Sequence, residues 1–425
     1  MLIHLRALGC RLNEAELEIW AQSFQKAGHQ ISPELHHANV IILNSCAVTQ
    51  EAARKSRQLI RRLHHQNPTA KLVVSGCYAT LNETEVAQLL GVDLVISNAD
   101  KSQLVEKTLS ELNFDTMPAM STEAGAHSLF TRGRQRAFVK VQDGCRYRCT
   151  FCIVTIARGE EVSRPLTAII DEINQLHQQG INEVILTGVH LGGYGTEIQL
   201  DLSTLIESIL QETTILRLRL GSLEPWDLPD DFFNLFQNPR LMPHLHLPLQ
   251  SGCDRVLKRM ARRCKTQEFA DIVTKARQKN ADFNITTDII VGFPDESEEE
   301  WQQSFDFIKK IGFGGIHIFS YSHREGTKAA TLANPIRKEI KKQRSKQLHQ
   351  LAAVMKQQFI ETQLNKQVSV LWETPQTDSL TGNLLNVGYT PNYLRVACEH
   401  SLDNPLENTL SSVTLKTIAP NYIHA

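Results

Sequence analysis

Three cysteines separated by three and by two residues constrain this chain more than any other feature. Cys145, Cys149 and Cys152 fall within eight residues, directly after the strand-like segment 137–141. Three thiolates can hold three irons of a four-iron four-sulfur cluster, and the fourth iron then stays open for an external ligand. A structural zinc site usually takes four protein ligands, and no Cys or His follows Cys152 until His177. The spacing therefore favours an open cluster over zinc or structural thiols.

Length and composition agree with a multidomain protein of a reducing compartment. A chain of 425 residues predicts two to four domains, and a hydrophobic content of 41% supports sizeable cores. Nine cysteines, an odd number, suit the cytosol better than a disulfide framework. No apolar run approaches the length of a membrane span, and the N-terminus lacks the layout of a signal peptide. We therefore expect a cytoplasmic protein that does not contact a membrane.

Short apolar runs alternate with helical stretches over residues 1–115. Residues 2–8, 40–43, 72–74 and 94–96 have the character of strands, and the segments between them have helix-like composition. Such alternation predicts a small domain in which helices cover a parallel sheet.

Three further cysteines each stand just beyond one of these strands. They are Cys10, Cys46 and Cys77, and a glycine directly precedes Cys10 and Cys77. Ligands of open parallel sheets gather at the carboxyl ends of the strands, so these thiols should converge at one edge. Three separate buried thiols are the alternative. The shared position after a strand favours a second cluster site.

A second series of strands and helices occupies residues 131–335, after a linker-like stretch at 113–136. The strand candidates are residues 137–141, 183–186, 215–220, 244–247, 285–291 and 315–320. Six such units are too few for a closed eight-stranded barrel. We therefore expect a partial (β/α)6 barrel whose site lies at the C-terminal ends of its strands.

The last part of the chain changes character. Residues 336–364 form a charged helical connector, and residues 365–425 hold short strand-like pieces at 368–373, 383–389 and 394–397. This pattern predicts a small antiparallel β-barrel, a fold often used to hold nucleic acid. The fold class is thus α/β, with a parallel-sheet domain, a partial barrel and a terminal β-domain.

The triplet, with Phe151 directly before Cys152, resembles the cluster loop of the radical S-adenosylmethionine superfamily. A second three-cysteine domain before it and a small β-domain after it narrow the resemblance to the methylthiotransferases, whose terminal domain is the TRAM-like RNA-binding type. The resemblance covers nearly the whole chain. The matching motifs are residues 8–13, 44–49, 75–79, 157–165, 248–252 and 288–294.

Within that family the chain looks most similar to the branch that acts on N6-threonylcarbamoyladenosine of tRNA. The motifs that point to this branch are residues 9–13, 141–144, 187–190 and 388–393. The isopentenyladenosine branch usually has a Gln-Met-Asn-type first motif, and the ribosomal-protein branch a Pro-Lys-Asn-type one. Two departures concern neither set of cysteines: Cys253 stands where Ser is common, and residues 221–225 replace a more usual Ser-Ser start.

The resemblance implies an enzyme that converts N6-threonylcarbamoyladenosine, next to the anticodon (position 37), to its 2-methylthio form. The cluster on Cys145, Cys149 and Cys152 would cleave S-adenosylmethionine to a radical that removes hydrogen from carbon 2 of the adenine ring. A second four-iron four-sulfur cluster would provide the sulfur. The six expected catalytic and metal-ligating residues are therefore Cys10, Cys46, Cys77, Cys145, Cys149 and Cys152. An electron donor and a sulfur donor would be further partners.

Residues at the expected strand ends would bind S-adenosylmethionine. They are Phe151, Thr187, Gly188, Ser222, Glu224, Gln250, Asp288 and Gly292. Glycine there admits close approach of a cofactor to the backbone. Each polar residue has a second interpretation as a helix cap or turn former, and Phe151 as ordinary loop packing.

The net charge of −1 does not by itself indicate a nucleic-acid binder. RNA contact is expected instead from local clusters of basic residues. The clusters are residues 54–62, 132–136 and 258–265. Arg158 and Arg164 are candidates for binding substrate phosphate or carboxylate, with a solvated surface pair as the alternative. Tyr393 and Arg395 complete the expected contacts to the anticodon stem-loop, whose unstacked bases can stack on aromatic rings.

Three other functions remain open at this stage. Two are methylthiotransferases with another substrate, either isopentenyladenosine of tRNA or an aspartate of a ribosomal protein. The third is a non-catalytic RNA-binding protein whose metal stabilises the fold. The last of these predicts that Cys145→Ala costs stability but changes no RNA modification. A charged substituent calls for a cationic partner and a prenyl group for an apolar pocket, so the lining of the site separates the two tRNA branches.

Overall fold

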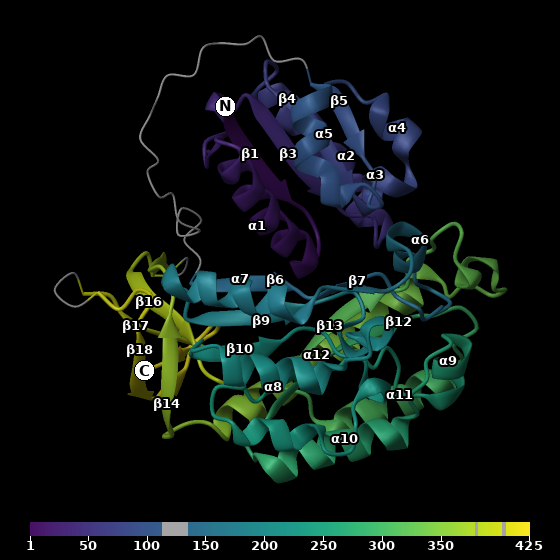
Figure 1. Cartoon of the computed structure of the whole chain (residues 1–425). Coiled ribbons are helices and arrows are strands. Elements are labelled where there is room, and N and C mark those ends of the chain that lie inside the picture. The colour runs from purple at the N-terminus through teal and green to yellow at the C-terminus, as the bar shows by residue number, and fades with distance from the viewer. Residues whose placement is uncertain (113–134, 379–380, 402–404) are drawn as a thin grey trace.

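The computed structural model describes residues 1–112, 135–378, 381–401 and 405–425. Three parts follow one another along the chain, and the N-terminal sheet lies against one side of the central barrel (Figure 1). Each helix in the described ranges is too short or too polar to cross a membrane. The expected linker at 113–136, with Arg132 and Arg134, lies almost wholly outside the described residues.

The N-terminal part is a five-stranded, entirely parallel sheet with strand order β2-β1-β3-β4-β5, as the sequence predicts. Its strands are β1 (Leu2–Ala7), β2 (Gln30–Ile31), β3 (Val40–Ser45), β4 (Lys71–Gly76) and β5 (Val92–Ile96). Its helices are α1 (Arg11–Lys26), α2 (Gln50–Gln66), α3 (Cys77–Leu81), α4 (Glu83–Ala87) and α5 (Leu104–Glu111). β3 is buried along its whole length, because separate apolar cores cover the two faces of the sheet.

The central part contains all six expected strands, in two parallel sheets of order β10-β9-β6 and β11-β12-β13. The strands are β6 (Arg136–Lys140), β9 (Glu183–Thr187), β10 (Arg217–Leu220), β11 (His244–His246), β12 (Asn284–Val291) and β13 (Gly315–Ser320). Parallel bridges from Leu218 to Leu241 and from Ser222 to His246 join the two sheets. β6 and β13 remain edge strands in the described part of the chain, so the barrel is partial.

Helices cover the outside of this partial barrel. They are α7 (Leu166–Gln178), α8 (Leu202–Glu212), α9 (Asp254–Arg259), α10 (Thr266–Lys279), α11 (Glu298–Ile311) and α12 (Lys338–Glu361). One large apolar core lies between these helices and alternate residues of the strands. The short helix α6 (Val154–Arg158) instead packs against α3 of the N-terminal part. Two short strands, β7 (Gln142–Asp143) and β8 (Val162–Ser163), pair with each other beside the cysteine triplet.

The terminal part differs from the expected closed antiparallel barrel. Its strands are β14 (Gln367–Trp372), β15 (Gln376–Thr377), β16 (Leu384–Tyr389), β17 (Arg395–Glu399), β18 (Leu410–Thr414), β19 (Thr417–Ile418) and β20 (Ile423–His424). They form a curled half-barrel in which β17 and β20 are parallel, and the edge strands β18 and β19 do not pair among the described residues. The expected small antiparallel β-barrel is thus corrected to a half-barrel with one parallel pair, and β19 and β20, with two residues each, are too short to complete a barrel ladder.

Candidate functional site

The cysteine triplet lies on a loop between β7 and α6, and residues 144–153 are called the cluster loop below. All three thiols are free and half-buried. Burial raises the pKa of Cys145 to about 12 and that of Cys152 to about 11, so these thiolates need a nearby cation. Gly144 has a φ of +71°, and a Cβ there would lie 1.8 Å from the Glu160 carbonyl oxygen. The tight entry to the loop and its buried sulfurs fit a loop that wraps an iron–sulfur cluster.

The other three cysteines converge at one edge of the N-terminal sheet. Cys10 directly precedes α1, Cys46 follows β3, and Cys77 begins α3 directly after β4. β1, β3 and β4 are neighbours in the sheet, which brings their carboxyl ends together. A Cβ on Gly9 would lie 2.7 Å from the Cys46 sulfur. The predicted convergence is confirmed, and the role of these thiols as cluster ligands stays a prediction.

Burial and mutual repulsion both act on these thiols. Burial raises the pKa of Cys46 to about 11, and the neighbouring Cys10 and Cys77 raise it further while Arg158 lowers it. The pKa of Cys10 is also raised, first by burial. Three thiols that disfavour each other's ionisation in a confined space suit a site whose metal supplies the compensating positive charge.

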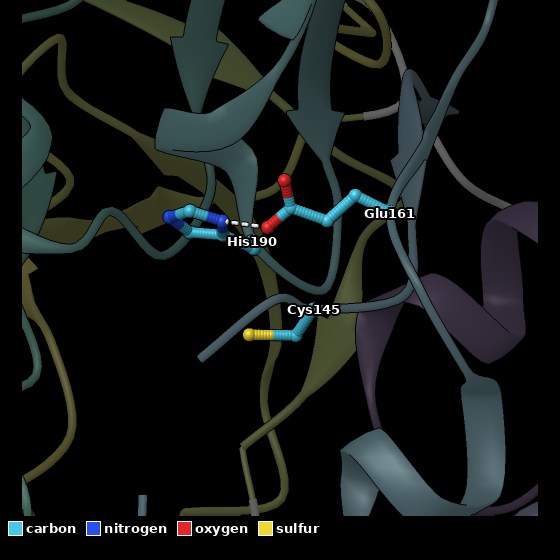
Figure 2. A group of neighbouring side chains, drawn as sticks. All are labelled: Cys145, Glu161 and His190. Carbon is cyan, nitrogen blue, oxygen red and sulfur yellow. Dashed lines mark hydrogen bonds and ion pairs between the residues drawn. The ribbon is translucent and has the colours of Figure 1, made fainter. Parts of the chain in front are cut away.

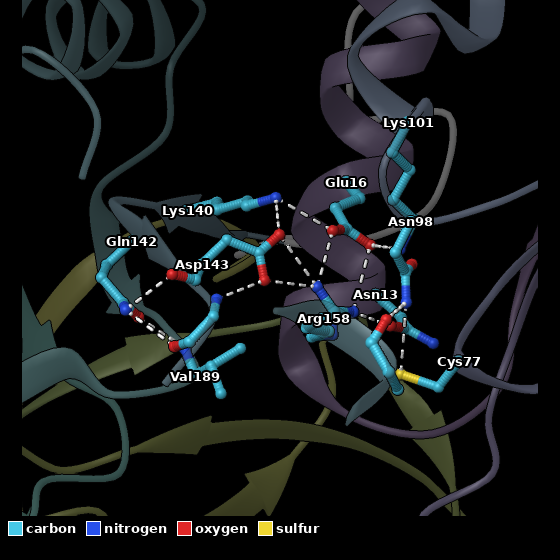
Figure 3. Close-up of polar contacts among 12 residues, drawn as sticks. Asn13, Glu16, Cys77, Asn98, Lys101, Lys140, Gln142, Asp143, Arg158 and Val189 are labelled. Atoms are coloured by element: carbon cyan, nitrogen blue, oxygen red, sulfur yellow. Dashed lines mark hydrogen bonds and ion pairs between the residues drawn. The ribbon is translucent and has the colours of Figure 1, made fainter. Parts of the chain in front are cut away.

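A buried ion-pair network connects α1, which follows Cys10, with Asp143 and Arg158 on either side of the cluster loop (Figure 3). Glu16 of α1 accepts from Lys101 at 2.5 Å, Lys140 at 3.0 Å and Arg158 at 3.0 Å. Arg158 also contacts Asp143 at 2.9 Å. Burial alone raises the pKa of Glu16, but these three cations hold it well below its ordinary value. Glu16 is therefore a buried carboxylate that the surrounding cations keep ionised.

The network continues to the cysteines through two asparagines. Asn13 accepts from Arg158 at 2.8 Å, and its Oδ1 lies 3.6 Å from the Cys10 sulfur. Asn98 donates to the carbonyl oxygen of Ala157 at 2.7 Å, and its Nδ2 lies 3.9 Å from the Cys77 sulfur. The two cysteine sites are thus held in a fixed relation by groups from both parts of the chain.

Arg158 and Arg164 bond to protein groups in this structure. The Arg158 side chain is only 2% exposed and belongs to the network above. Arg164 contacts Glu172 at 2.6 Å and donates to the carbonyl oxygen of Lys140 at 2.7 Å. Substrate contact by either arginine stays a prediction. The sequence reading missed the partners Glu16 and Glu172, which lie on helices and have no local signature of burial.

Gln142 connects the cluster loop to the end of β9, where Thr187 and Gly188 were expected to bind a cofactor. Its Oε1 accepts from the backbone N–H groups of Val189 and His190 at 3.0 and 2.8 Å, and its Nε2 donates to the Gly144 carbonyl at 2.8 Å. A Cβ on Gly188 would lie 2.9 Å from the Gln142 Oε1. This close packing explains the glycine and fixes the strand end beside the cluster loop.

His190 and the carboxylates around it form a second polar cluster beside the cluster loop. Sequence reasoning did not assign His190 a place in the site. Figure 2 shows its ring beside Glu161, with the Cys145 side chain nearby. The ring is fully buried, and its Nε2 lies 2.6 Å from Asp227. Burial alone lowers the pKa of His190, but hydrogen bonds and charges of Asp227, Glu224 and Glu161 raise it above its ordinary value. The signals in the sequence are its place in the motif at residues 187–190 and its position shortly after a buried strand.

The remaining expected cofactor residues lie along the same edge of the barrel. Ser222 and Glu224 follow β10, Gln250 follows β11, and Gly292 follows β12. Burial raises the pKa of Glu224 to about 6. Gln250 and Gly292 both have positive φ angles, +75° and +71°. Phe151 packs into a small apolar cluster with residues such as Phe293 and Met260.

Asp288 lies in the middle of β12 and not at its end, where the sequence placed it. Its Oδ1 is 3.1 Å from His246 Nε2 and 3.3 Å from His317 Nδ1. Burial alone raises the pKa of Asp288, but these two histidines hold it below its ordinary value. Asp288 therefore faces the barrel interior in a small polar group with His246 and His317, neither of which the sequence reading had singled out.

Tyr393 and Arg395 lie at the opposite end of the barrel from the cysteines. Both line a cavity of about 870 Å³ between α12, the beginning of β12 and the terminal sheet. The Tyr393 ring stacks on His244, the first residue of β11, and on Tyr389, with centroid distances of 4.8 and 5.0 Å. The structure thus separates this pair from Arg158 and Arg164, which lie beside the cluster loop.

Comparisons with known proteins agree with this fold and site. The model of the radical SAM superfamily matches residues 139–308, and that of the uncharacterized protein family UPF0004 matches residues 2–97. The radical S-adenosylmethionine methyltransferase TsrM from Kitasatospora setae has the same fold, with a TM-score of 0.57 and 14% identity over 75% of this chain and 72% of its own. Fold and site define a radical S-adenosylmethionine protein.

Two curated relatives narrow this class. The threonylcarbamoyladenosine tRNA methylthiotransferase MtaB of Thermotoga maritima is 35% identical over 377 residues, 87% of this chain and 86% of its own length. The tRNA-2-methylthio-N(6)-dimethylallyladenosine synthase of Geobacillus kaustophilus is 32% identical over 403 residues, 91% of this chain and 75% of its own length. The chain belongs to the radical S-adenosylmethionine methylthiotransferase family and is a transferase.

Proposed function

We propose that this enzyme converts N6-threonylcarbamoyladenosine next to the anticodon of tRNA to its 2-methylthio derivative. The observation that carries the proposal is the pairing of two three-cysteine sites, which the Glu16–Arg158 network joins. Similarity to a relative named for this reaction supports the choice of substrate. Such a substrate would place the enzyme in the cytoplasm.

Two four-iron four-sulfur clusters and S-adenosylmethionine are the proposed cofactors. Cys145, Cys149 and Cys152 would hold one cluster, and Cys10, Cys46 and Cys77 the other. When bound, these groups supply the radical and sulfur chemistry for a carbon–hydrogen bond that is too weakly acidic for a side-chain base. An external electron donor and an external sulfur donor would then be needed for repeated turnover.

The chain's own side chains would bind and orient the reactants. Gln142 holds the cluster loop against the end of β9. Glycine is required at Gly188 and Gly292 because the side chains of Gln142 and Lys341 fill the space that a Cβ would need. The proposed binding residues for S-adenosylmethionine are Phe151, Thr187, Gly188, Ser222, Glu224, Gln250, Asp288 and Gly292. The N-terminal part lies over the barrel and would keep water from the reacting atoms (Figure 1).

Contacts to the anticodon stem-loop are proposed at two places. Arg158 and Arg164 lie near the cluster loop. Either arginine would bind the substrate only by exchanging a carboxylate partner that it has in this structure. Tyr393 and Arg395 line the cavity beside the terminal sheet, where an aromatic ring and a cation suit an unstacked nucleotide.

Mass spectrometry of tRNA nucleosides tests the function directly. The chain is expressed in a host that lacks its own methylthiotransferases, beside the variants Cys10→Ala, Cys145→Ala and, as a control, Cys398→Ala in the terminal sheet. We expect 2-methylthio-N6-threonylcarbamoyladenosine with the wild-type chain and Cys398→Ala, and none with the other two variants. Appearance of only the isopentenyl product would overturn the choice of substrate, and absence of both products with both clusters assembled would overturn action on tRNA.

A further inference from the structure

Arg11 occupies an unusual electrostatic position between the three parts of the chain. It is the first residue of α1 and directly follows Cys10. Its Nη2 donates to the Tyr393 hydroxyl at 3.2 Å, and its guanidinium carbon lies 5.7 Å from the ring centroids of both Tyr393 and Phe138. No carboxylate of the described residues lies within 4.0 Å of this half-buried guanidinium.

The neighbouring cations, in contrast, have carboxylate partners. Arg136 lies 2.7 Å from Glu373, and Arg219 lies 2.9 Å from Glu183. Both arginines, like Arg11, also lie over the ring of Tyr393. Among the described residues, these ion pairs leave Arg11 without a carboxylate partner, and Arg217 shares Glu183 with Arg219, so positive charge is in excess in this region.

The pKa of the Tyr393 hydroxyl reflects this excess of positive charge. Burial alone raises the pKa of its hydroxyl, but Arg136, Arg11 and Arg219 hold it below its ordinary value. A region that stabilises an anionic form of a tyrosine also favours an anionic ligand.

The Arg11 guanidinium lies on the interior side of β6. On β6, Ala137 and Val139 point into the core between strands and helices, so Phe138 points to the opposite, interior face. Arg11 lies over Phe138, on the side of the barrel where α1 packs beside β6 (Figure 1). It is also the residue next to Cys10. The guanidinium itself lies beside Tyr393, toward the end of the barrel away from the cysteines, so a substituent that extends from a base at the cysteine sites into the barrel interior would point toward Arg11.

We propose that Arg11 binds the carboxylate of the threonylcarbamoyl group and so sets the preference for this substrate over bases with uncharged substituents. This inference rests on the proposed function and deepens it. A guanidinium presents paired N–H groups that match a carboxylate, and the Tyr393 hydroxyl occupies only one of its five N–H groups. The flanking rings of Phe138 and Tyr393 exclude water and strengthen such a pair. An isopentenyl group offers no acceptor and leaves this cation unpaired.

The test compares RNAs that differ only in the charge of the substituent. Anticodon stem-loops carry N6-threonylcarbamoyladenosine, its methyl ester or isopentenyladenosine, and their affinities for the holoenzyme are measured by fluorescence anisotropy at one fixed salt concentration. The variants are Arg11→Gln, which keeps hydrogen-bond donors without the charge, and Arg11→Lys, which keeps the charge. Arg6→Gln, an exposed arginine of β1, is the matched control.

We expect the wild-type enzyme and Arg6→Gln to bind the acid about 10- to 100-fold more tightly than the ester, the range for a charged hydrogen-bonded pair. Arg11→Gln should bind the acid and the ester equally, with ester affinity unchanged, and Arg11→Lys should keep part of the preference. Equal weakening of all three RNAs by Arg11→Gln would show that Arg11 only joins the parts of the chain, and would overturn the proposal.

The wild-type enzyme alone provides a further check that needs no variant to fold. Equal affinity for the acid and the ester would overturn the role of Arg11. Failure of the proposed function is distinguishable, because it would show as absence of the methylthio product from the acid-bearing RNA, whichever RNA binds best.

Discussion

Arg158, the last residue of α6, forms a 3.0 Å ion pair with Glu16 of α1, and the two side chains are only 2% and 3% exposed. α1 begins directly after Cys10, and α6 follows the cluster loop. The pair therefore connects the two cysteine sites across the boundary between two parts of the chain. Because both charges are buried, breaking the pair is costly: each charge would then lie away from water without its partner.

Removing one partner of this pair should destabilise the enzyme strongly. Arg158→Met leaves Glu16 and Asp143 buried with less compensating charge, and we expect the free energy of unfolding to fall by about 3–5 kcal/mol. Glu16→Met should have a similar effect, and the double variant should lose less than the sum of the two. Urea unfolding followed by tryptophan fluorescence measures these values.

The exposed pair of Arg148 and Glu160 is the matched control. Its nitrogen–oxygen distance is 2.7 Å, but its side chains are 63% and 71% exposed. Arg148→Met should therefore cost at most about 1 kcal/mol. If Arg148→Met and Arg158→Met had equal effects, burial would not be what makes the Glu16–Arg158 pair important.

The positions of the cysteines could be predicted from the sequence, whereas the network around them could not. Cys10, Cys46 and Cys77 each follow a strand of a parallel sheet, and this topology alone brings them to one edge. Glu16 lies on an ordinary amphipathic helix, where a carboxylate is most often solvated. Its burial against Arg158 arises from the packing of two parts of the chain, which no local pattern encodes.

The terminal sheet also has features that could not be predicted from the sequence. The strands β14, β16 and β17 were predicted from apolar runs, but β19 and β20 are too short to give a periodic signal. The stacking of Tyr393 on His244 was also outside local reasoning, because it depends on how the terminal sheet meets the beginning of β11. Patterns within one element were predictable, and contacts between elements distant in the chain were not.

Replacement of Gly9 by alanine should damage the second cysteine site alone. A Cβ at this position would lie 2.7 Å from both Cβ and Sγ of Cys46, and the φ of +112° is unfavourable for any side chain. In anaerobically reconstituted Gly9→Ala, we expect iron per chain to fall toward half of the wild-type value. The cluster on the loop around Cys149 should remain detectable by electron paramagnetic resonance.

Gly28→Ala separates backbone strain from the clash with Cys46. Gly28 also has a positive φ, +82°, but a Cβ there meets nothing within 4 Å. The variant should lose about 1–2 kcal/mol of stability and keep its full iron content. Equal iron loss in both variants would mean that strain in the N-terminal part, rather than contact with Cys46, controls assembly of the second cluster.

The stability of the enzyme should depend on pH through Glu296, which supports the turn at Gly292. Glu296 accepts from the Gly292 N–H at 3.1 Å and pairs with Arg344 at 2.8 Å, with both side chains buried. Burial raises its pKa from 4.5 to about 7, although Arg344 opposes the shift. The folded state therefore holds a proton between these pH values that the unfolded state has lost.

This difference in proton binding gives the sign of the effect. The contribution of Glu296 is complete below pH 4.5 and is lost as the pH rises through about 7, a change of up to about 3 kcal/mol. Urea unfolding of wild-type and Glu296→Gln enzymes between pH 5 and 8 measures this change. As the pH rises, the free energy of unfolding of the wild type should fall relative to that of Glu296→Gln. Glu298→Gln removes an exposed partner of the same Arg344 and should show no such trend. A difference that instead favoured the wild type with rising pH would mean that Arg344 keeps Glu296 ionised in the folded enzyme.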